Sequence, residues 1–208
     1  MARKKASPED RIIDAALKLA LAQGWHDLAL ADIAAEAKVS LPELAHVFRS
    51  KAEILAAFSR RIDAEVLAAA EAEDLGSESP RDRLFDVLML RFDALAPHKP
   101  ALKRIALDLV GDPLGAVPLI RPTLQSLGWM LEAAGIDTSG LRGAIRVRGL
   151  ALVWAAAFRV WLNDGEDQAK TMAELDKRLR QAEEWKDALS RLRTRKTDAA
   201  ADEPPPGP

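Results

Sequence analysis

The side chains that could do chemistry gather between residues 38 and 51. Cations in this segment can neutralise the phosphate charges of DNA, and side chains on the short helix predicted over 41–47 can reach the edges of bases. The candidate DNA-contacting residues are Lys38, Ser40, Leu41, Pro42, Glu43, His46, Arg49 and Lys51. Hydrogen-bonded base recognition favours Arg, Lys, Asn and Gln, which the helix lacks, so it is a poor base-reading set.

Some of these residues have simpler explanations. Ser40 and Glu43 have the spacing of a capping box, in which both side chains bond to free amides at a helix start, and we favour this role for Glu43 over recognition of a cytosine. His46 can be a DNA contact or an ordinary surface histidine. The basic residues 3–5 can be a DNA-contacting arm or a solvated terminus.

The charge of the chain gives DNA binding only modest support. The full sequence has a formal net charge of -2, and residues 1–60 hold nine Lys or Arg against eight Asp or Glu. Counterion release from several phosphates drives much of the affinity for DNA. Binding would therefore depend on a local patch, in which Lys38, Arg49 and Lys51 are the clearest donors.

The sequence contains no catalytic constellation. Its three histidines, His26, His46 and His98, are too scattered for a metal site, and it has no cysteine. A glycine-rich phosphate loop and a nucleophile motif are also missing. We therefore predict a protein that is not an enzyme and holds no metal or cofactor. No apolar segment follows the basic start, which predicts a cytoplasmic location.

The elements that must position these residues are helices, because apolar residues recur every three or four positions. The pattern predicts helices over 8–23, 31–37, 41–47 and 50–73, with the two short ones crossing around a tight turn. It divides the chain into a basic flexible arm (1–6), a helix-turn-helix domain (7–56), a helical ligand-binding and dimerisation domain (57–193) and a disordered tail (194–208). A polar break at 76–80 precedes a helix capped by Ser79.

In the second domain, Arg91 falls within the apolar stripe of the helix that Ser79 caps. Prolines between residues 97 and 122 are expected to divide the middle into short helices and turns, before a smoother helix over 123–134. Two long helices over 139–162 and 167–193 are expected to form an antiparallel pair around the turn Asn163-Asp164-Gly165.

The helix over 139–162 is apolar on most of its circumference. One face can meet the core and another a second copy of the chain, which predicts a homodimer through the last two long helices. The large side chains Trp154, Phe158 and Trp161, with Trp129 and Met130 opposite, are candidates to line a pocket for a small apolar ligand or lipid. A fully packed core explains the same residues more simply and is favoured by the sequence alone.

The amino-terminal segment resembles the TetR family over about residues 8–56. The matching residues are Gly24-Trp25, Asp32-Ile33-Ala34, Val39-Ser40, Phe48 and Ser50-Lys51. The resemblance implies an all-α TetR-like fold, a two-fold dimer, a helix 41–47 that enters the major groove, and phosphate contacts from helix 31–37 and the start of helix 50–73. Three positions depart from the pattern: Ala29, Lys38 and Ala45. Lys38 replaces the turn glycine, and a positive φ there would cost about 1 kcal/mol.

The body shows a second resemblance. Residues 135–138, the Trp154 helix, residues 162–164 and residues 171–179 are similar to the lipid-binding proteins of ubiquinone biosynthesis, which share a TetR-like fold. This resemblance implies isoprenoid lipids, a hydroxylase partner at the membrane surface, and a helix-turn-helix that need not bind DNA.

Together these observations predict a TetR-type homodimeric regulator, a ligand-responsive repressor that binds operator DNA. The alternative is a TetR-fold lipid-binding accessory protein of ubiquinone biosynthesis that does not bind DNA. A third possibility is a dimeric structural module without a ligand, which a fully packed body would favour.

Overall fold

The computed structural model describes residues 7–72 and 79–184, and all regular structure within them is helical. The all-α prediction is therefore confirmed. The elements are α1 (Pro8–Gln23), α2 (Leu30–Ala37), α3 (Leu41–Val47), α4 (Lys51–Ala72), α5 (Pro80–Leu95), the 3-10 helix η2 (Ala96–His98), α6 (Lys99–Gly111), α7 (Pro113–Ala133) and α8 (Gly140–Trp161). Residues 169–184 form a further helix.

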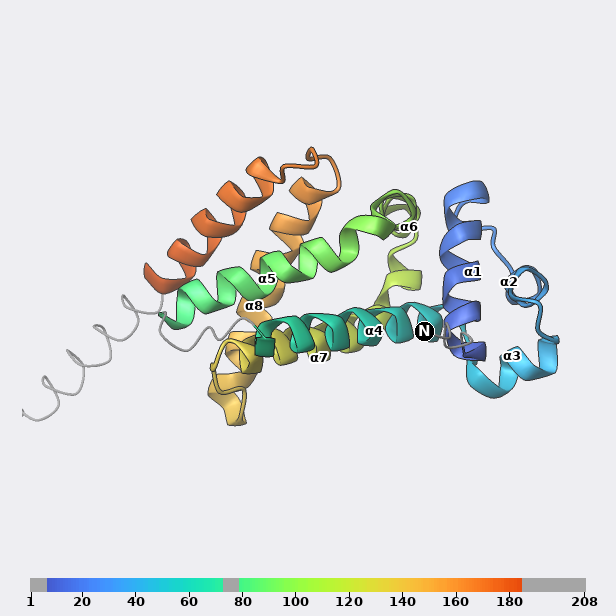
Figure 1. Ribbon diagram of the computed structural model, residues 1–208, viewed down its shortest axis with the longest axis horizontal. Coiled ribbons are helices and arrows are strands. Elements are labelled where there is room, and N and C mark those ends of the chain that lie inside the picture. The colour runs from blue at the N-terminus through green and yellow to red at the C-terminus, as the bar shows by residue number, and fades with distance from the viewer. Residues whose placement is uncertain (1–6, 73–78, 185–208) are drawn as a thin grey trace, which may run out of the picture.

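The molecule is elongated, with α1, α2 and α3 at one end and α5, α8 and helix 169–184 towards the other (Figure 1). We call the first three helices the helix-turn-helix unit and the rest the body. α4 leaves this unit, packing against α1 and then along α5 and α7. α6 also packs on α1. Two helices of the body therefore touch the helix-turn-helix unit.

Local capping explains where the first helix begins. The hydroxyl of Ser7 accepts from the Asp10 amide at 3.1 Å, and the Asp10 carboxylate accepts from the Ser7 amide at 3.3 Å. This is the reciprocal pairing of a capping box. At the other end Gly24 has φ 95° and ψ 164°, a conformation with positive φ that favours glycine and that is not left-handed helical.

The middle of the chain corrects one prediction. Residues 113–133 form one continuous helix, α7, with Pro118 and Pro122 inside it. Each proline removes one bond of the helical ladder. The first turns of α7 lie at the surface, where Leu114 and Val117 are exposed, so water can satisfy the freed carbonyl groups. The prolines therefore weaken α7 locally without dividing it.

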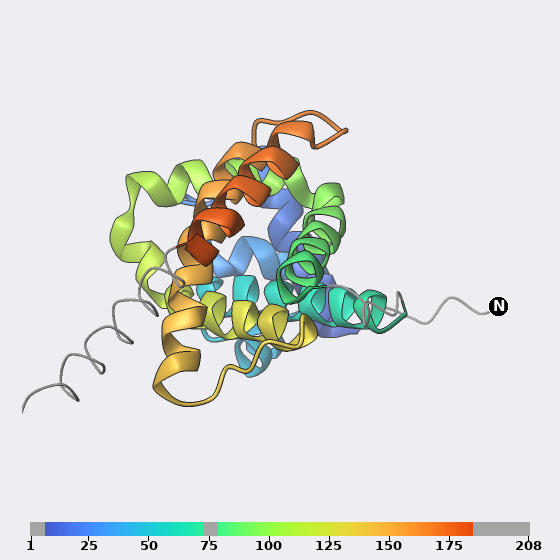
Figure 2. The same ribbon diagram turned by 90° about the vertical axis from the view of Figure 1, so that its left-hand side faces the viewer.

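The chain reverses after α8, as predicted. Asp164 holds the turn, because its carboxylate accepts from the amide and the hydroxyl of Thr171, both at 2.7 Å. Helix 169–184 then runs back antiparallel to α8 (Figure 2). The predicted end of this helix at residue 193, the arm 1–6, the tail 194–208 and the greater part of the break 76–80 lie outside the described residues.

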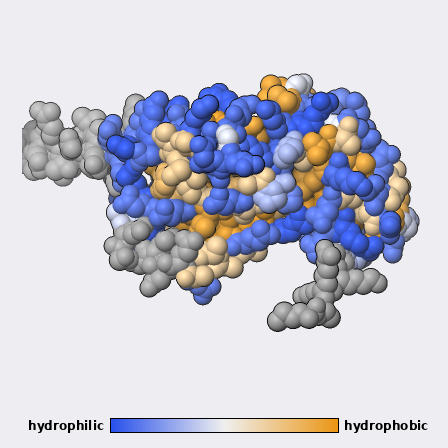
Figure 3. Space-filling view, turned by 45° about the horizontal axis from the view of Figure 1, so that its top comes forward, coloured by the Kyte–Doolittle hydropathy of each residue, from blue (hydrophilic) through white to orange (hydrophobic). Residues whose placement is uncertain are grey.

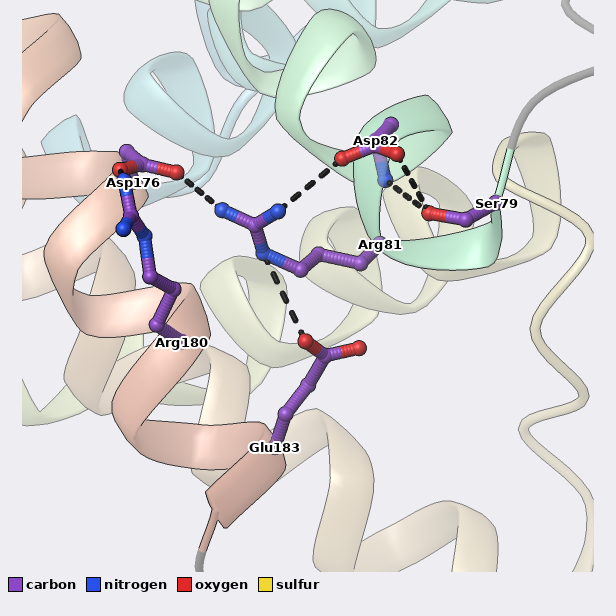
Figure 4. Close-up of polar contacts among 6 residues, drawn as sticks. All are labelled: Ser79, Arg81, Asp82, Asp176, Arg180 and Glu183. Atoms are coloured by element: carbon purple, nitrogen blue, oxygen red, sulfur yellow. Dashed lines mark hydrogen bonds and ion pairs between the residues drawn. The ribbon is translucent and has the colours of Figure 1, made fainter.

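Helix 169–184 is tied to the start of α5 by Arg81 (Figure 4). The guanidinium of Arg81 bonds Asp82 at 3.1 Å and also bonds Asp176, and its Nε lies 3.6 Å from Glu183. Arg180 adds a second bond to Asp176. These contacts, together with the buried Leu175 and Leu179, fix the last described helix on the body.

Candidate functional site

The helix-turn-helix unit has a well-packed scaffold. Ile33, Ala34, Leu44 and Phe48 are buried and hold α2 and α3 at their crossing. Lys38 ends α2 in the left-handed conformation, with φ 55° and ψ 45°. Lys38 thus has the positive φ of the glycine that it replaces, and this conformation carries a strain of about 1 kcal/mol.

The exposed face of α3 offers few hydrogen-bonding groups. The Glu43 carboxylate accepts from the amide and the hydroxyl of Ser40, both at 2.7 Å, and these bonds lower the pKa of Glu43. The predicted capping box is confirmed, and the Glu43 side chain is engaged at the helix start. Leu41, Pro42 and His46 are exposed beside it. The surface that α3 presents is mostly apolar.

The cap of α2 is weaker than the cap of α3. Ala29 occupies the N-cap position and has no side-chain acceptor, so only the reverse bond forms, from the Ala29 amide to the Asp32 carboxylate at 3.0 Å. The departure from the family pattern at Ala29 therefore removes one cap and leaves the helix in place.

Lys51 is committed to the loop between α1 and α2 (residues 24–29). Its Nζ donates to the carbonyl oxygens of Trp25 at 2.7 Å and His26 at 3.0 Å, and lies 5.4 Å from the centre of the Trp25 ring. Burial lowers the pKa of Lys51. Among the predicted phosphate contacts, Lys38 and Arg49 are exposed, whereas the Lys51 ammonium already has backbone partners.

The same loop is held from its other side by Asp108 of α6, a residue that the sequence did not single out. The Asp108 carboxylate accepts from the amides of Trp25 at 2.6 Å and His26 at 3.4 Å. The bond from Trp25 is the main cause that lowers the pKa of Asp108. Lys51 thus binds the carbonyls and Asp108 binds the amides of the same two residues. We call this arrangement the loop grip.

The body contains a cavity of about 220 Å³ between α4, α5, α6, α7 and α8. Its walls are mostly apolar, and it is lined by Ser59, Arg91 and Thr123 among its polar residues. Of the predicted pocket residues, Trp154 and Phe158 line this cavity. Met130 and Trp161 are completely buried in the core. Trp129 is 56 % exposed and lines a separate, open groove. The structure thus brings two of the five predicted side chains to the body cavity.

A buried polar cluster forms one side of the cavity. Arg91 bonds the Asp63 carboxylate through Nη1 and the Ser59 hydroxyl through Nη2, the latter at 3.2 Å. Ser126 donates to the same Asp63 oxygen at 2.6 Å. The Arg91 guanidinium also lies 5.1 Å from the centre of the Trp154 ring. The cluster joins α4, α5, α7 and α8 around one charge pair.

One donor of this cluster has no partner. Nε of Arg91 is buried and makes no hydrogen bond. An unsatisfied buried donor costs about 1–3 kcal/mol. The signal for this cluster is present in the sequence, because Arg91 interrupts an apolar stripe. Asp63 and Ser59, the oxygen partners of Arg91, lie 28 and 32 residues away and cannot be identified from local spacing.

Two further features bear on function. The described residues contain no group of three or more His, Cys, Asp or Glu side chains that could hold a metal ion. Within the same ranges, every helix is too short or too polar to cross a membrane.

Comparisons with known proteins cover the helix-turn-helix unit by family and most of the chain by fold. Residues 12–58 match the bacterial regulatory proteins of the tetR family. The TetR transcriptional regulator from Nitrosomonas europaea ATCC 19718 is similar with a TM-score of 0.66 at 26% identity, and the match covers 85% of this chain and 98% of that chain. The TetR-like fold predicted from the sequence is confirmed.

Two more distant structures show likeness of fold alone. A TetR transcriptional regulator from Rhodococcus sp. RHA1 has a TM-score of 0.59 at 19% identity, over 83% of this chain and 93% of that one. A tetR-family regulator from Streptomyces coelicolor has a TM-score of 0.55 at 19% identity, over 100% of this chain and 94% of that one. No curated protein matches the chain, so the resemblance of the body to lipid-binding proteins gains no support.

Proposed function

We propose that this chain, which belongs to the TetR family of bacterial regulatory proteins, is a homodimeric transcriptional regulator whose hold on operator DNA weakens when an apolar ligand fills the body cavity. One observation carries the proposal. The body cavity and the loop grip share two helices, so that a change in the cavity has a direct route to the helix-turn-helix unit.

The shared helices are α4 and α6. α4 lines the cavity with Leu55 and Phe58 and carries Lys51 in its first turn. α6 lines the cavity with Ile105 and carries Asp108 one turn away. A ligand that shifts either helix would move one side of the loop grip and tilt α2 and α3 relative to the DNA.

On the DNA side we assign phosphate contacts to Lys38 and Arg49 and groove contacts to the exposed α3 side chains Leu41, Pro42 and His46. Apolar side chains can contact thymine methyl groups in the major groove. Since Glu43 is held in its capping box, we assign it and Ser40 to fixing the start of α3, which orients the helix. Because few cations contribute, the salt dependence of binding should be shallow for a DNA-binding protein.

The dimer is supported by an apolar face on α8. Leu141, Ile145 and Leu152 lie on one side of the helix and are 79%, 62% and 76% exposed. Apolar patches between hydrophilic residues are visible on the surface (Figure 3). Covering such a face with the same face of a second copy is the usual way to make a two-fold dimer. We expect Ile145→Glu with Leu152→Glu to sediment as a monomer, whereas Leu21→Glu on α1 stays dimeric.

The proposal is tested by fluorescence anisotropy on DNA from the region upstream of the gene, titrated across salt. We expect sequence-preferring binding whose salt slope falls by about four when Lys38→Ala and Arg49→Ala are combined, because the dimer loses two cations from each of its two copies. Lys170→Ala with Lys177→Ala removes the same charge at the far end of the molecule and should leave the slope unchanged. Absence of binding at about 50 mM salt would overturn the regulator and restore the lipid-binding alternative.

A further inference from the structure

We propose that the body cavity binds a neutral, largely apolar molecule that carries a carbonyl-type hydrogen-bond acceptor, and that Arg91 recognises this acceptor. The inference rests on the proposed function, because it names the class of ligand for the same cavity. It is carried by the size of the cavity, the donors on its wall and the balance of charge beside them.

The size of the cavity sets the scale of the group that it can hold. Its volume is about 220 Å³. An apolar cavity of about 150 Å³ in another protein holds benzene. A single ring with a short substituent therefore fits inside it.

The donors on the wall call for an acceptor. Arg91 bonds Asp63 and Ser59 with its two terminal nitrogens, but its Nε has no partner. Thr123, also on the wall, already donates its hydroxyl to the Leu119 carbonyl at 2.8 Å. The remaining capacity of Thr123 is therefore that of an acceptor, and the unused donor is Nε of Arg91. A ligand with an oxygen acceptor can take it up after a small shift of the guanidinium.

The charge balance favours a neutral acceptor over a carboxylate. The positive charge of Arg91 is already matched by Asp63, which is buried and also accepts from Ser126. Among the described residues that line the cavity, only Arg91 has a charged side chain. A ligand carboxylate would bring a second anion to one buried cation, and burying an unmatched charge is costly.

Leucine side chains separate the cavity from a second space. Leu55, Leu109 and Leu119 line both the cavity and an open groove of about 560 Å³ beside the α1–α2 loop. That groove is also lined by the charged side chains of Arg49, Lys51, Asp108 and Asp112. A molecule that enters from the groove passes these charges and displaces leucine side chains before it reaches Arg91.

Three probes of similar size separate the possible ligand classes. Acetophenone has a ring and a carbonyl, cumene has the same shape without an acceptor, and benzoate carries a charge. Binding to the purified full chain, without DNA, is measured by calorimetry and by the shift in melting temperature. We expect acetophenone to bind about tenfold more tightly than cumene, since hydrogen bonds to charged donors contribute this much or more. Benzoate should bind most weakly.

A double variant assigns the preference to Arg91. Asp63→Asn with Arg91→Met removes both charges and leaves no unpaired ion, so the body should still fold. We expect this variant to bind acetophenone and cumene equally, and its binding of cumene shows that the cavity is intact. Asp82→Asn with Arg81→Met, at the surface cluster of α5, serves as the matched control and should keep the tenfold preference.

Each other result contradicts the inference. Equal binding of acetophenone and cumene to the natural sequence would show that Arg91 does not recognise the ligand. Tightest binding of benzoate would assign an anionic ligand instead, and no binding of any probe would mean that the body is a packed core. Failure of DNA binding alone would sink the regulator and leave the ligand class standing, because the probe measurements contain no DNA.

Discussion

In the helix-turn-helix unit, the capping carboxylates of Asp10 and Glu43 bond to residues three positions away and stay near the surface. In the body, Arg91 pairs with residues 28 and 32 positions away and is buried with its partner. The polar groups of the unit can therefore change with local consequences, whereas those of the body are tied to the packing of four helices. This difference explains how α3 can keep the family scaffold while its contact surface departs from the family pattern.

Removal of the Arg91 side chain should cause the largest change in the free energy of unfolding, and this change tests the comparison between unit and body. Arg91→Ala leaves Asp63 buried without its cation, and removal of one partner from a buried ion pair costs about 3–5 kcal/mol. Urea unfolding of the single variant should show this loss in the free energy of unfolding. Asp63→Asn with Arg91→Met should recover most of it. A loss below about 1 kcal/mol, as for an exposed pair, would show that the cluster does not hold the helices together.

The same division marks what could be predicted from the sequence. The bounds of α1 and α3 follow from Ser7, Pro8, Ser40 and Glu43, because caps act within three or four residues. The place of Lys38, where the family has glycine, marked the one turn at which a positive φ would carry strain, but left open whether the turn would keep that conformation. The continuity of α7 could not be predicted, since a proline breaks a helix or is tolerated according to whether its freed carbonyl reaches water. That depends on the neighbouring helices.

The contacts between the two regions could not be predicted from the sequence either. Lys51 was expected to bind phosphate, and only the folded chain shows its Nζ between two carbonyl groups of the α1–α2 loop. Asp108 lies 83 residues from Trp25, so no local pattern relates them. The aromatic residues of α8 suggested a pocket, but their division between cavity and core depends on how α8 is rotated against α5 and α7.

A second prediction concerns the loop grip. Asp108→Asn removes the charge that the Trp25 and His26 amides bond, so we expect these two amides to exchange hydrogen faster with solvent while the core amides of α1 are unchanged. Mass spectrometry of exchanged peptides measures this, with Glu65→Gln on exposed α4 surface as control. Unchanged exchange at Trp25 would show that Lys51 alone holds the loop.

Acid should also speed hydrogen exchange at the Trp25 amide of the natural sequence. Because the amide bonds lower the pKa of Asp108 below its ordinary value of 3.8, the folded state favours the carboxylate. The stability contributed by this contact is therefore complete above pH 3.8 and is lost as the pH falls through the lowered pKa. Exchange of the Trp25 amide, corrected for its intrinsic pH dependence, should rise in that window and stay constant between pH 5 and 8.

A smaller effect is expected at the two helix caps of the unit. Ser40→Ala removes the side-chain cap of α3 and should lower the free energy of unfolding by about 1 kcal/mol. Ala29→Ser supplies the missing acceptor at the start of α2 and should raise it by a similar amount. Both are measured by urea unfolding. If Ala29→Ser left the free energy of unfolding unchanged, the free amides at the start of α2 would not need a side-chain acceptor at position 29.

The smallest effect on stability is expected at Lys38, and it separates fold from function. Lys38→Gly relieves the strain of a positive φ but adds freedom to the unfolded chain, so the net gain is about 0.5 kcal/mol. The same change removes one phosphate donor from each copy of the dimer and should reduce the salt slope of DNA binding by about two. Lys38→Arg is the control, since it keeps the charge and the strain. A more stable protein that binds DNA less tightly would show that Lys38 is retained for its charge at a cost to the scaffold. If Lys38→Gly bound DNA as tightly as the natural sequence, the phosphate contacts would have to come from Arg49 and the basic residues 3–5.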